Sequence, residues 1–567
     1  EFLTVWLGDG NTVCFRRGES GNSWGLFTGD PPSAGKAQRE KFQLKVIGTR
    51  IFMLSPLARR IYVFQNQAPG LGRALFILDR NGNAIRFTYA DPEHNNPSSI
   101  SDGLGRTLYF TYVQGDEDAE AVLTLVTDGE DRSVHFSYEN AFDNGGFPSL
   151  REVRNANSET TRLSYQPAEY KGTTPSTFYL DNVSTVTKPR GNVPYTQHYG
   201  VRAIRGSRAV RVVSQFHADG HRRYLMYDEE SFGVLDQKTV DTVIRHGHHG
   251  HHSSPQAWTD PDGKTVNFER DGSDRTTAMV DRKGARTEMS YFTLTGELSS
   301  LTNAKGGVTS HSRTSQSQTV KAPDDSSVNF VFYNLTRTTY PDGTTELREY
   351  DERGNVAAVT DRTGVRMDFT YDERGQLLAA TNAAGGVTVH TYNDDGTMAT
   401  STNSDTGTTT YGYDRYKRRT TMTHPDQTTT LTSYDANDRV LSATDENGKT
   451  ASIGYNANGN VETQTDRVGN ENVRVYNDMD WAIQETDRTG RSLYHEYNPF
   501  GKRVETRNDA GHVQTFVHNN RDLLVNTWEG PTMGDWQTTY DAEGIRTSSI
   551  TPLGHTTHYA SDALGKI

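Results

Sequence analysis

Five histidines stand close together in the middle of this chain, at His246, His248, His249, His251 and His252. Imidazole nitrogens at this density could bind Zn²⁺ or Ni²⁺. The glycines between them favour a loop, however, and a defined metal site needs ligands that other contacts hold in place. We therefore interpret the segment as a solvated insertion, keep the five histidines as a weak candidate metal site, and predict no cofactor.

Adjacent carboxylates are the next residues that could do chemistry. Pairs such as Asp324-Asp325 and Asp394-Asp395 could serve as the acid and base of a glycosidase. Asp394-Asp395 is followed by Gly396, a neighbourhood typical of turns, so we favour a turn role for these acids. A Ser/His/Asp triad stays open, but Gly21-Asn22-Ser23-Trp24-Gly25 shares only a Gly-x-Ser core with a nucleophile elbow. We predict no catalytic residue and a non-enzymatic chain.

Composition limits the possible partners. The net charge of -13 disfavours nucleic acid, whose phosphates demand a basic surface. No apolar run is long enough to span a membrane, and no signal peptide is visible. Cys14 is the only cysteine, which excludes an internal disulfide and favours folding in a reducing cytosol. The first residue is not Met and the last repeat is incomplete, so we expect an internal fragment of a longer protein.

An aromatic-rich but weakly apolar composition favours a folded protein with thin walls. The apolar fraction is only 33% and the mean hydropathy is -0.76, yet the chain has 28 Tyr and 22 Phe. Such a chain is too aromatic to be disordered and too polar for one thick core. Sheets with a hydrated face, or a shell around a cavity, fit these numbers.

Tyr followed by Asp or Asn recurs every 21 residues, from Tyr350-Asp351 through Tyr371-Asp372 to Tyr497-Asn498, and slips by one residue at Tyr540-Asp541. A fixed period of this size indicates a repeat array. A side chain that recurs in this way builds a wall more often than an active site. We therefore assign a structural role to the repeated positions Tyr350, Asp351, Gly354, Tyr371, Asp372, Gly375, Tyr434, Asp435, Tyr455, Gly459, Tyr497, Gly501, Tyr540, Asp541 and Gly544.

Each period divides into a β-hairpin. In one repeat we predict a turn at 371–375, a strand at 376–381, a second turn at 382–385 and a second strand at 386–391. Glycine closes both turns, and the Asp or Asn after Tyr can accept hydrogen bonds from its own backbone. The repeats after residue 350 predict about twenty antiparallel strands, too many for a flat sheet, so the sheet must coil into a barrel or a spiral. Which face lies inside stays open.

A ten-residue spacing from Asp to Tyr extends the array toward the N-terminus. It joins Asp79 to Tyr89, Asp102 to Tyr112, Asp128 to Tyr138 and Asp281 to Tyr291. We therefore predict three segments: an N-terminal β region of the shell at 1–75, irregular repeats with insertions at 76–345, and regular 21-residue repeats at 346–567.

Residues 350–356 and 371–377 resemble the consensus of the Rhs/YD-repeat family, strongly over 346–567 and more weakly over about 75–345. The resemblance implies an all-β fold: a long antiparallel sheet of hairpins wound into a hollow spiral shell, or cocoon. In this family the shell encloses a C-terminal toxin segment, which the family's own aspartates release. Asp91-Pro92 and Asp260-Pro261 do not match that cleavage segment, so we expect only the wall here.

The resemblance also implies partners and a route. The expected function is a shell that sequesters its own C-terminal toxin domain for contact-dependent interbacterial competition. The expected partners are that toxin domain and either a secretion spike with its chaperone or a toxin-complex partner. The chain would be made in the cytoplasm and exported, by type VI secretion in bacterial Rhs effectors. One alternative is a B/C component of an insecticidal toxin complex, and another is a surface adhesion or glycan-binding protein that uses exposed Tyr and Arg.

Overall fold

The computed structural model describes residues 2–6, 12–17, 24–26, 41–66, 72–90, 96–113, 121–139, 149–168, 180–204, 207–218, 222–227, 234–236, 243–246, 255–259, 264–273, 275–498, 501–519, 521–530 and 534–560. All regular secondary structure in these residues is β-strand. No helix in the described residues is long and apolar enough to cross a membrane.

The first sheet has 19 strands and covers the N-terminal part of the chain. Its strands are β1 (Phe2–Trp6), β2 (Thr12–Arg17), β3 (Trp24–Leu26), β4 (Gln43–Ile47), β5 (Arg50–Ser55), β6 (Arg60–Gln65), β7 (Arg73–Leu78), β8 (Ala84–Thr88), β9 (Ser99–Ser101), β10 (Thr107–Val113), β11 (Val122–Thr127), β12 (Ser133–Glu139), β13 (Ser149–Arg154), β14 (Thr160–Ala168), β15 (Leu180–Thr187), β16 (Tyr195–Ile204), β17 (Ser207–His217), β18 (Arg222–Tyr227) and β19 (Val234–Asp236).

The second sheet has 29 strands and holds the regular repeats. Its strands are β20 (Val243–His246), β21 (Pro255–Thr259), β22 (Thr265–Arg270), β23 (Thr276–Val280), β24 (Arg286–Tyr291), β25 (Leu298–Thr302), β26 (Val308–Lys321), β27 (Ser327–Thr339), β28 (Thr345–Tyr350), β29 (Val356–Thr360), β30 (Arg366–Tyr371), β31 (Leu377–Thr381), β32 (Val387–Tyr392), β33 (Met398–Asn403), β34 (Gly407–Tyr413), β35 (Arg419–Thr423), β36 (Thr429–Tyr434), β37 (Val440–Thr444), β38 (Thr450–Tyr455), β39 (Val461–Thr465), β40 (Glu471–Tyr476), β41 (Ala482–Thr486), β42 (Ser492–Tyr497), β43 (Arg503–Asn508), β44 (Val513–His518), β45 (Leu524–Glu529), β46 (Asp535–Tyr540), β47 (Arg546–Ile550) and β48 (Thr556–His558).

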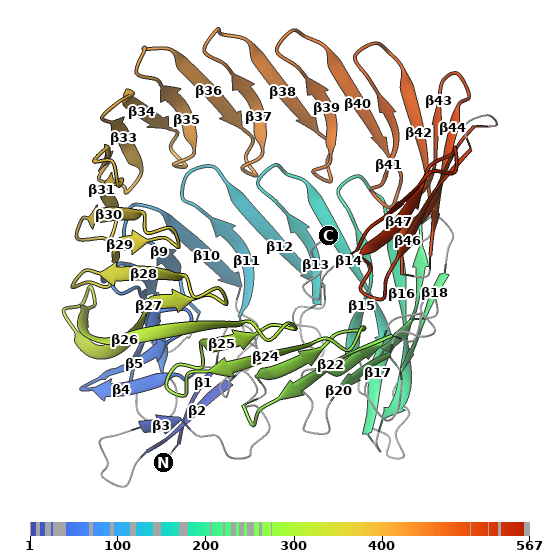
Figure 1. The fold of residues 1–567 in the computed structure, drawn as a ribbon. Coiled ribbons are helices and arrows are strands. Elements are labelled where there is room, and N and C mark those ends of the chain that lie inside the picture. Colours follow the sequence, from blue (N-terminus) through green and yellow to red (C-terminus); the bar gives the residue numbers. More distant parts are fainter. Residues whose placement is uncertain are drawn as a thin grey trace.

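Strand order in both sheets follows the chain. Within each sheet every strand pairs antiparallel with the next in sequence, as β30 does with β31 and β31 with β32. The hairpins predicted from the repeat are therefore confirmed, with strand bounds shifted by about one residue. Figure 1 shows the second sheet rising and passing above the first, so that β36–β41 lie over β10–β14. The predicted all-β spiral shell is the observed fold.

The larger hydrophobic core of the described residues forms where the long hairpin β26–β27 packs on β5, β6 and β7. The apolar side chains Phe52, Ile61 and Leu78 from the first sheet meet Val320 and Phe330 from the second, and all are at most 2% exposed. A smaller buried cluster joins β1, β2, β4 and β5. Burial of these large apolar side chains stabilises the contact between the two sheets, by about 25 cal/mol for each Å² of apolar surface removed from water.

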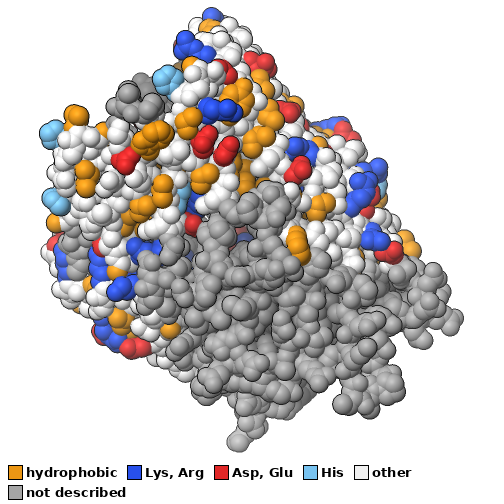
Figure 2. All heavy atoms as spheres, turned by 90° about the vertical axis from the view of Figure 1, so that its right-hand side faces the viewer, with side chains coloured by type: hydrophobic (Ala, Val, Ile, Leu, Met, Phe, Trp, Pro, Cys, Tyr) orange, Lys and Arg blue, Asp and Glu red, His pale blue; other side chains and the backbone are white. Residues whose placement is uncertain are grey.

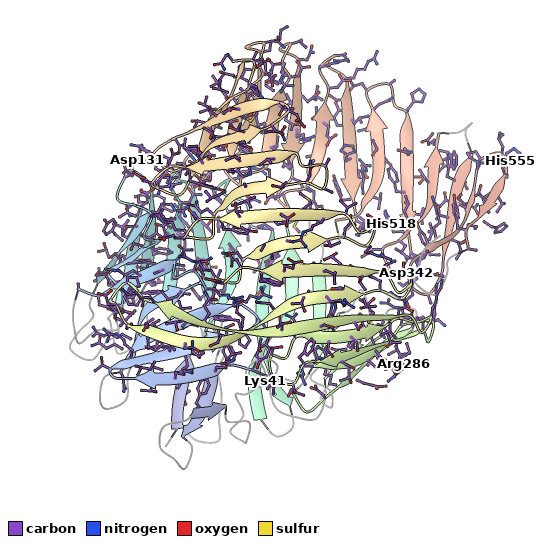
Figure 3. The ribbon with its side chains drawn as sticks, turned by 60° about the vertical axis from the view of Figure 1, so that its left-hand side comes forward. Lys41, Asp131, Arg286, Asp342, His518 and His555 are labelled. Carbon is purple, nitrogen blue, oxygen red and sulfur yellow. The ribbon has the colours of Figure 1, made fainter. Side chains whose placement is uncertain are left out.

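The regular repeats, by contrast, form a single-layered wall. Among the described residues after 345, Ala358 is the only buried apolar side chain. Figure 2 shows apolar, basic and acidic side chains interspersed over one face of the molecule. Figure 3 shows the wall turned by 60°, with His518 and His555 far from Asp131. This thin, polar construction explains the low apolar fraction of the chain.

The predicted segment boundaries fall inside continuous strand pairing. The division at 75 lies within β7, and the division at 345 lies at the start of β28. Strand β7 pairs with β6 and β8, and β28 pairs with β27 and β29. Strand pairing continues across both divisions. The three segments therefore stay a prediction, which concerns the regularity of the repeats in the sequence.

Candidate functional site

The repeated tyrosine ties the strand that it ends to the strand before it in the sheet. The hydroxyl of Tyr371 donates to the backbone carbonyl of Val356 at 2.9 Å, fifteen positions earlier. The same bond occurs at Tyr350, Tyr392, Tyr413, Tyr434, Tyr455, Tyr476 and Tyr497, and at Tyr89, Tyr138, Tyr165 and Tyr291 in the less regular repeats. Tyr540 reaches one residue further, to Leu524. The slip in the sequence period is thus absorbed without losing the bond.

The residue after the tyrosine builds the turn. The Oδ1 atom of Asp351 accepts the backbone N–H groups of Arg353 and Asn355, at 2.9 and 2.8 Å. Gly354 donates its N–H to the Asp351 carbonyl and has a φ of 83°, which glycine adopts at little cost. Asp372, Asp435 and Asp541 make the same side-chain bonds in their turns, and Asn456 does so in the turn closed by Gly459.

The adjacent acids also lie in turns. Asp324 Oδ1 accepts the Ser326 hydroxyl at 2.5 Å, and Asp395 Oδ1 accepts the Thr397 N–H at 3.0 Å. Each carboxylate thereby satisfies nearby backbone or hydroxyl donors, as the turn interpretation requires. Gly501 and Gly544 likewise close turns with positive φ.

Loss of one tyrosine hydroxyl tests the value of this bond. In a Tyr371→Phe variant the Val356 carbonyl loses its side-chain donor, so we expect the free energy of unfolding to fall by about 1 kcal/mol. The measurement is urea denaturation followed by tryptophan fluorescence. Tyr411→Phe is the matched control, since the Tyr411 hydroxyl makes no hydrogen bond among the described residues. Equal losses in both variants would contradict the role of the bond.

A second kind of contact closes the spiral, and we call it the seam. The seam is the row of contacts that two groups of turns make with the Tyr-Asp turns of the second sheet. The first group lies in the first sheet, at 79–83, 102–106, 128–132, 155–159 and 188–192, and the second is the turn at 281–285 between β23 and β24. The contacting residues of these turns are separated by 261 to 313 positions, close to one revolution of the spiral. Its bonds include Asn157 to Asp435 at 2.9 Å, Arg439 to Glu159 at 3.0 Å and Arg132 to Asp438 at 2.9 Å.

Arg80 is the most buried cation of the seam, with 8% of its surface exposed. Its guanidinium donates to Gln318 Oε1 at 3.0 Å, to Asn334 Oδ1 at 2.7 Å and to Gln316 Oε1 at 3.0 Å. It also lies 4.3 Å from the ring centre of Phe332. Burial, with the nearby charge of Arg59, lowers the pKa of Arg80 to about 10, so the side chain stays charged at neutral pH.

The repeat glycines at the seam have a second role besides turn geometry. A Cβ on Gly354 would lie 2.0 Å from the Arg80 guanidinium, and one on Gly375 would lie 2.2 Å from the Asn81 amide. A Cβ on Gly364 or Gly385, in the other set of turns, would meet nothing within 4 Å. Gly354 and Gly375 therefore leave the room that the turn at 79–83 of the neighbouring coil occupies.

Asp480 lies at the seam between Lys188, Arg190 and Asn458. Burial by itself would raise the pKa of Asp480, but hydrogen bonds from Lys188 and Asn458 and the charges of Lys188 and Arg190 outweigh it, so the pKa is lowered. A lowered folded-state pKa adds stability above the unfolded value of about 4, and that stability is lost as the pH falls through the folded-state pKa.

Acid should therefore loosen this part of the seam. We expect the melting temperature to fall as the pH drops below about 4, and we expect a smaller pH dependence in Asp480→Asn, which cannot be protonated. Calorimetry at a series of pH values measures both. An Asp480→Asn variant that loses stability over the same interval to the same extent would contradict the assignment.

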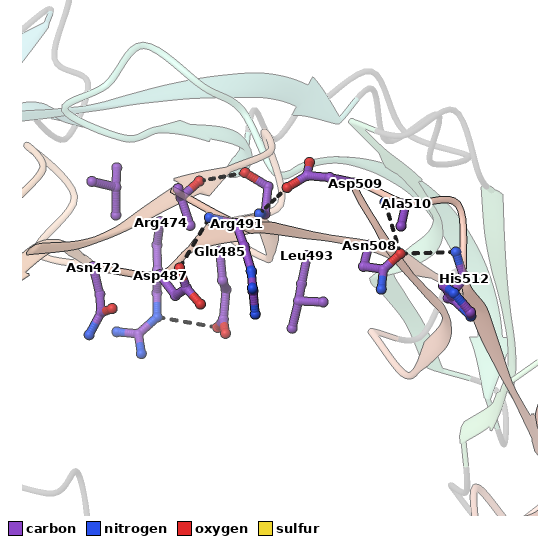
Figure 4. Close-up of a pocket in the computed structure, with 13 residues that line it drawn as sticks. Asn472, Arg474, Glu485, Asp487, Arg491, Leu493, Asn508, Asp509, Ala510 and His512 are labelled. Carbon is purple, nitrogen blue, oxygen red and sulfur yellow. Dashed lines mark hydrogen bonds and ion pairs between the residues drawn. The ribbon is translucent and has the colours of Figure 1, made fainter. Parts of the chain in front are cut away.

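A hollow of about 740 Å³ lies between the turns at 487–491 and 508–512, over strands β40–β43. Figure 4 shows Arg474, Glu485, Arg491 and Leu493 pointing to the same side of the sheet. Arg474 pairs with Glu485 at 3.2 Å, and Asp509 accepts the Ser492 N–H at 2.6 Å.

The candidate metal ligands are placed only in part. His246 ends strand β20, while His248, His249, His251 and His252 lie outside the described residues. Elsewhere in the described part of the chain, no group of three or more His, Cys, Asp or Glu side chains is arranged to hold a metal ion. The histidine segment therefore stays a prediction.

The seam was missed by the sequence analysis. Arg80, Asn81 and Arg190 carry no periodic signal of their own, because their partners come from the next coil of the spiral. One available signal was the Asp-Arg-x-Gly pattern of residues 79–82 and 281–284, which the seam uses at Arg80 and Arg282.

The fold and the turns define a class: a β-hairpin repeat protein wound into a spiral shell. Residues 350–388 and 434–471 match the family described as RHS Repeat. The chain therefore contains Rhs repeats in these two stretches.

Solved structures of toxin complexes are among the chains similar to this one. The TcdB2-TccC3-Cdc42 crystal structure is 13% identical, with a TM-score of 0.45, over 85% of this chain and 31% of that one. The Photorhabdus luminescens Tc holotoxin pore is 11% identical, with a TM-score of 0.39, over 98% and 37%. The chain thus spans about a third of the length of these solved chains. No curated protein matches it.

Proposed function

We propose that this chain is the wall of an encapsulating shell that sequesters the C-terminal toxin domain of an Rhs polymorphic toxin until delivery. The wall itself acts without catalysis in this proposal. The observation that carries it is the seam: a single-layered sheet is closed against its own next coil by buried and charged contacts, centred on Arg80.

A closed wall of this kind suits containment. An antiparallel sheet satisfies its backbone groups internally, and winding it into a spiral leaves few open edges for other chains to pair with. The described wall has no second layer and little hydrophobic core after residue 345. A wall one sheet thick is the construction expected of a container, whereas a solid domain would bury a core between two layers. The seam sets whether such an enclosure is tight.

The delivery route belongs to the same proposal. The shell would be made in the cytoplasm, loaded with its toxin, and exported with a type VI spike and chaperone for use against neighbouring bacteria. The alternative is a B/C component of an insecticidal toxin complex; TcdB2 and TccC3 are found together in solved structures. This alternative keeps the same shell and differs from the type VI proposal in the partner that the shell binds.

Protease protection tests containment in the complete gene product. We expect the segment C-terminal to the repeats to resist trypsin in the wild-type protein, and to be digested in Arg80→Ala, where the seam is weakened. Arg362 occupies the position of Arg80 in the exposed turn at 361–364, so Arg362→Ala should keep the protection. A C-terminal segment digested equally in wild type and both variants would overturn the proposal.

Cryo-electron microscopy of the same protein gives an independent readout. Density inside the shell that is lost when the C-terminal segment is deleted would support sequestration. An empty interior in the intact protein would refute it. Co-purification with a spike protein, or with a pore-forming partner, separates type VI delivery from a toxin complex, and Tyr-dependent binding to a glycan array would instead favour adhesion.

A further inference from the structure

The hollow between the turns at 487–491 and 508–512 has no role in the containment proposal. Its volume of about 740 Å³ falls within the range of about 300–1,000 Å³ that is typical of small-molecule sites. Leu493 supplies apolar surface to it, since this residue lines the hollow and is 42% exposed. Figure 4 shows Arg491 and Asn508 on the same side of the sheet as Leu493. The hollow therefore combines apolar surface with polar groups, as small-molecule sites do.

Arg491 differs from the equivalent arginines of other turns. Five other turns carry an arginine four positions after their first Asp, and in each the guanidinium Nε donates to that Asp at 2.5–2.8 Å: Arg106, Arg132, Arg275, Arg418 and Arg439. Arg491 keeps only the backbone bond to its Asp487, at 3.1 Å. Its guanidinium has no hydrogen bond or ion pair with any described residue, and it lines the hollow.

Two asparagines of the hollow are held so that their donors stay unused. Asn472 Oδ1 accepts the Arg488 N–H at 3.1 Å. Asn508 Oδ1 accepts the N–H groups of Ala510 and His512, at 3.1 and 2.9 Å. The Nδ2 group of each asparagine has no hydrogen-bond partner in the part of the chain that the structure describes. Both amides can therefore donate to a ligand.

The acids of the hollow, by contrast, already receive hydrogen bonds or ion pairs. Glu485 pairs with Arg474 at 3.2 Å, and Asp509 accepts the Ser492 N–H at 2.6 Å. Asp487 accepts two N–H groups and a hydroxyl of its own turn. The unused groups are thus donors, and one of them is a cation. Such a set favours a negatively charged ligand that accepts hydrogen bonds.

We propose that the hollow binds a small organic carboxylate with an apolar body. The carboxylate accepts two parallel hydrogen bonds from Arg491, the pairing for which a planar guanidinium is suited. The apolar body covers Leu493, and the removal of this surface from water favours binding. The amides of Asn472 and Asn508 donate to the remaining acceptors of the ligand.

Saturation-transfer difference NMR on the complete gene product tests the proposal, with 4-methylpentanoate as the probe. Its primary amide, 4-methylpentanamide, has the same shape without the charge, and acetate has the charge without the apolar body. We expect a saturable signal from 4-methylpentanoate. The amide and acetate should each bind about tenfold more weakly or worse, because each lacks one of the two contacts.

Arg491→Gln and Arg488→Gln form a matched pair of variants. Both remove one positive charge from the same turn, but Arg488 does not line the hollow. Binding of 4-methylpentanoate should weaken about tenfold in Arg491→Gln and stay unchanged in Arg488→Gln. Since the Arg491 guanidinium has no partner among the described residues, the melting temperature of Arg491→Gln should equal that of the wild type, which separates loss of the site from loss of the fold.

The proposal is overturned if the amide binds as tightly as the carboxylate, or if Arg491→Gln binds the carboxylate as the wild type does. Equal losses in the two arginine variants would also overturn it, as would a signal that does not saturate, because both indicate non-specific attraction. None of these results depends on a toxin domain inside the shell, so the ligand site and the containment function can fail separately.

Discussion

Replacing Arg80 with alanine is expected to lower the free energy of unfolding by about 3–5 kcal/mol, because a hydrogen bond from a charged donor contributes about 1.5–3 kcal/mol and three are lost. The variant deletes the donors to Gln316, Gln318 and Asn334. Gln316 Oε1 still accepts from the Asn334 amide at 2.6 Å, so the buried oxygens of Gln318 and Asn334 are the two left without a donor. Each such acceptor costs about 1–3 kcal/mol when its partner is removed. The loss also removes the contact with the Phe332 ring. Urea denaturation of the chain measures the change.

Arg362→Ala is the matched control for this prediction. Arg362 occupies the same turn position as Arg80, but it is exposed; it pairs with Asp342 and the Thr344 hydroxyl and lies 4.1 Å from the ring centre of Tyr340. Exposed pairs of this kind contribute about 0–1 kcal/mol. Losses of similar size in the two variants would show that the seam contributes little to the stability of the shell.

The second large effect is expected at the repeat glycines. Gly354 and Gly364 have φ of 83° and 87°, so alanine carries the same backbone penalty at either position, about 1–2 kcal/mol. At Gly354 the added Cβ also collides with the Arg80 guanidinium, at 2.0 Å, which three hydrogen bonds hold in place. We expect Gly354→Ala to cost about 1–3 kcal/mol more than Gly364→Ala, the range for overpacking.

Paired denaturation curves of the two variants measure this difference directly. The backbone penalty cancels between them, so the remainder reports the contact with the next coil. Equal midpoints would mean that Arg80 moves aside at no cost, and would contradict the tight seam on which the containment proposal rests.

The hairpin wall was predictable because its determinants are local. Tyr371, Asp372 and Gly375 act within one repeat: the hydroxyl bond spans fifteen residues and the turn bonds span four. Such interactions recur in sequence with the period of the structure, so the spacing alone predicts turns, strands and antiparallel order. The inward face could not be assigned, because a bulge before each tyrosine, as between Thr370 and Tyr371, breaks the simple alternation of side chains.

The seam was not predictable because its partners are brought together only by the pitch of the spiral. Asn157 and Asp435, or Arg282 and Glu543, stand 278 and 261 positions apart, and no period in the sequence relates them. Whether an Asp-Arg-x-Gly turn docks, like 79–82, or stays exposed, like 466–469, depends on which coil lies beside it.

The sequence by itself determined the repeating unit, its hairpin form and its likeness to Rhs repeats, since the bonds that build one repeat lie within about one period of each other. Only the tertiary structure decided where the wall closes, which cation becomes buried and which turns remain free. Those outcomes depend on the twist and coiling of many strands. Each strand adds a small rotation, and the sum of these rotations decides which turns of successive coils meet.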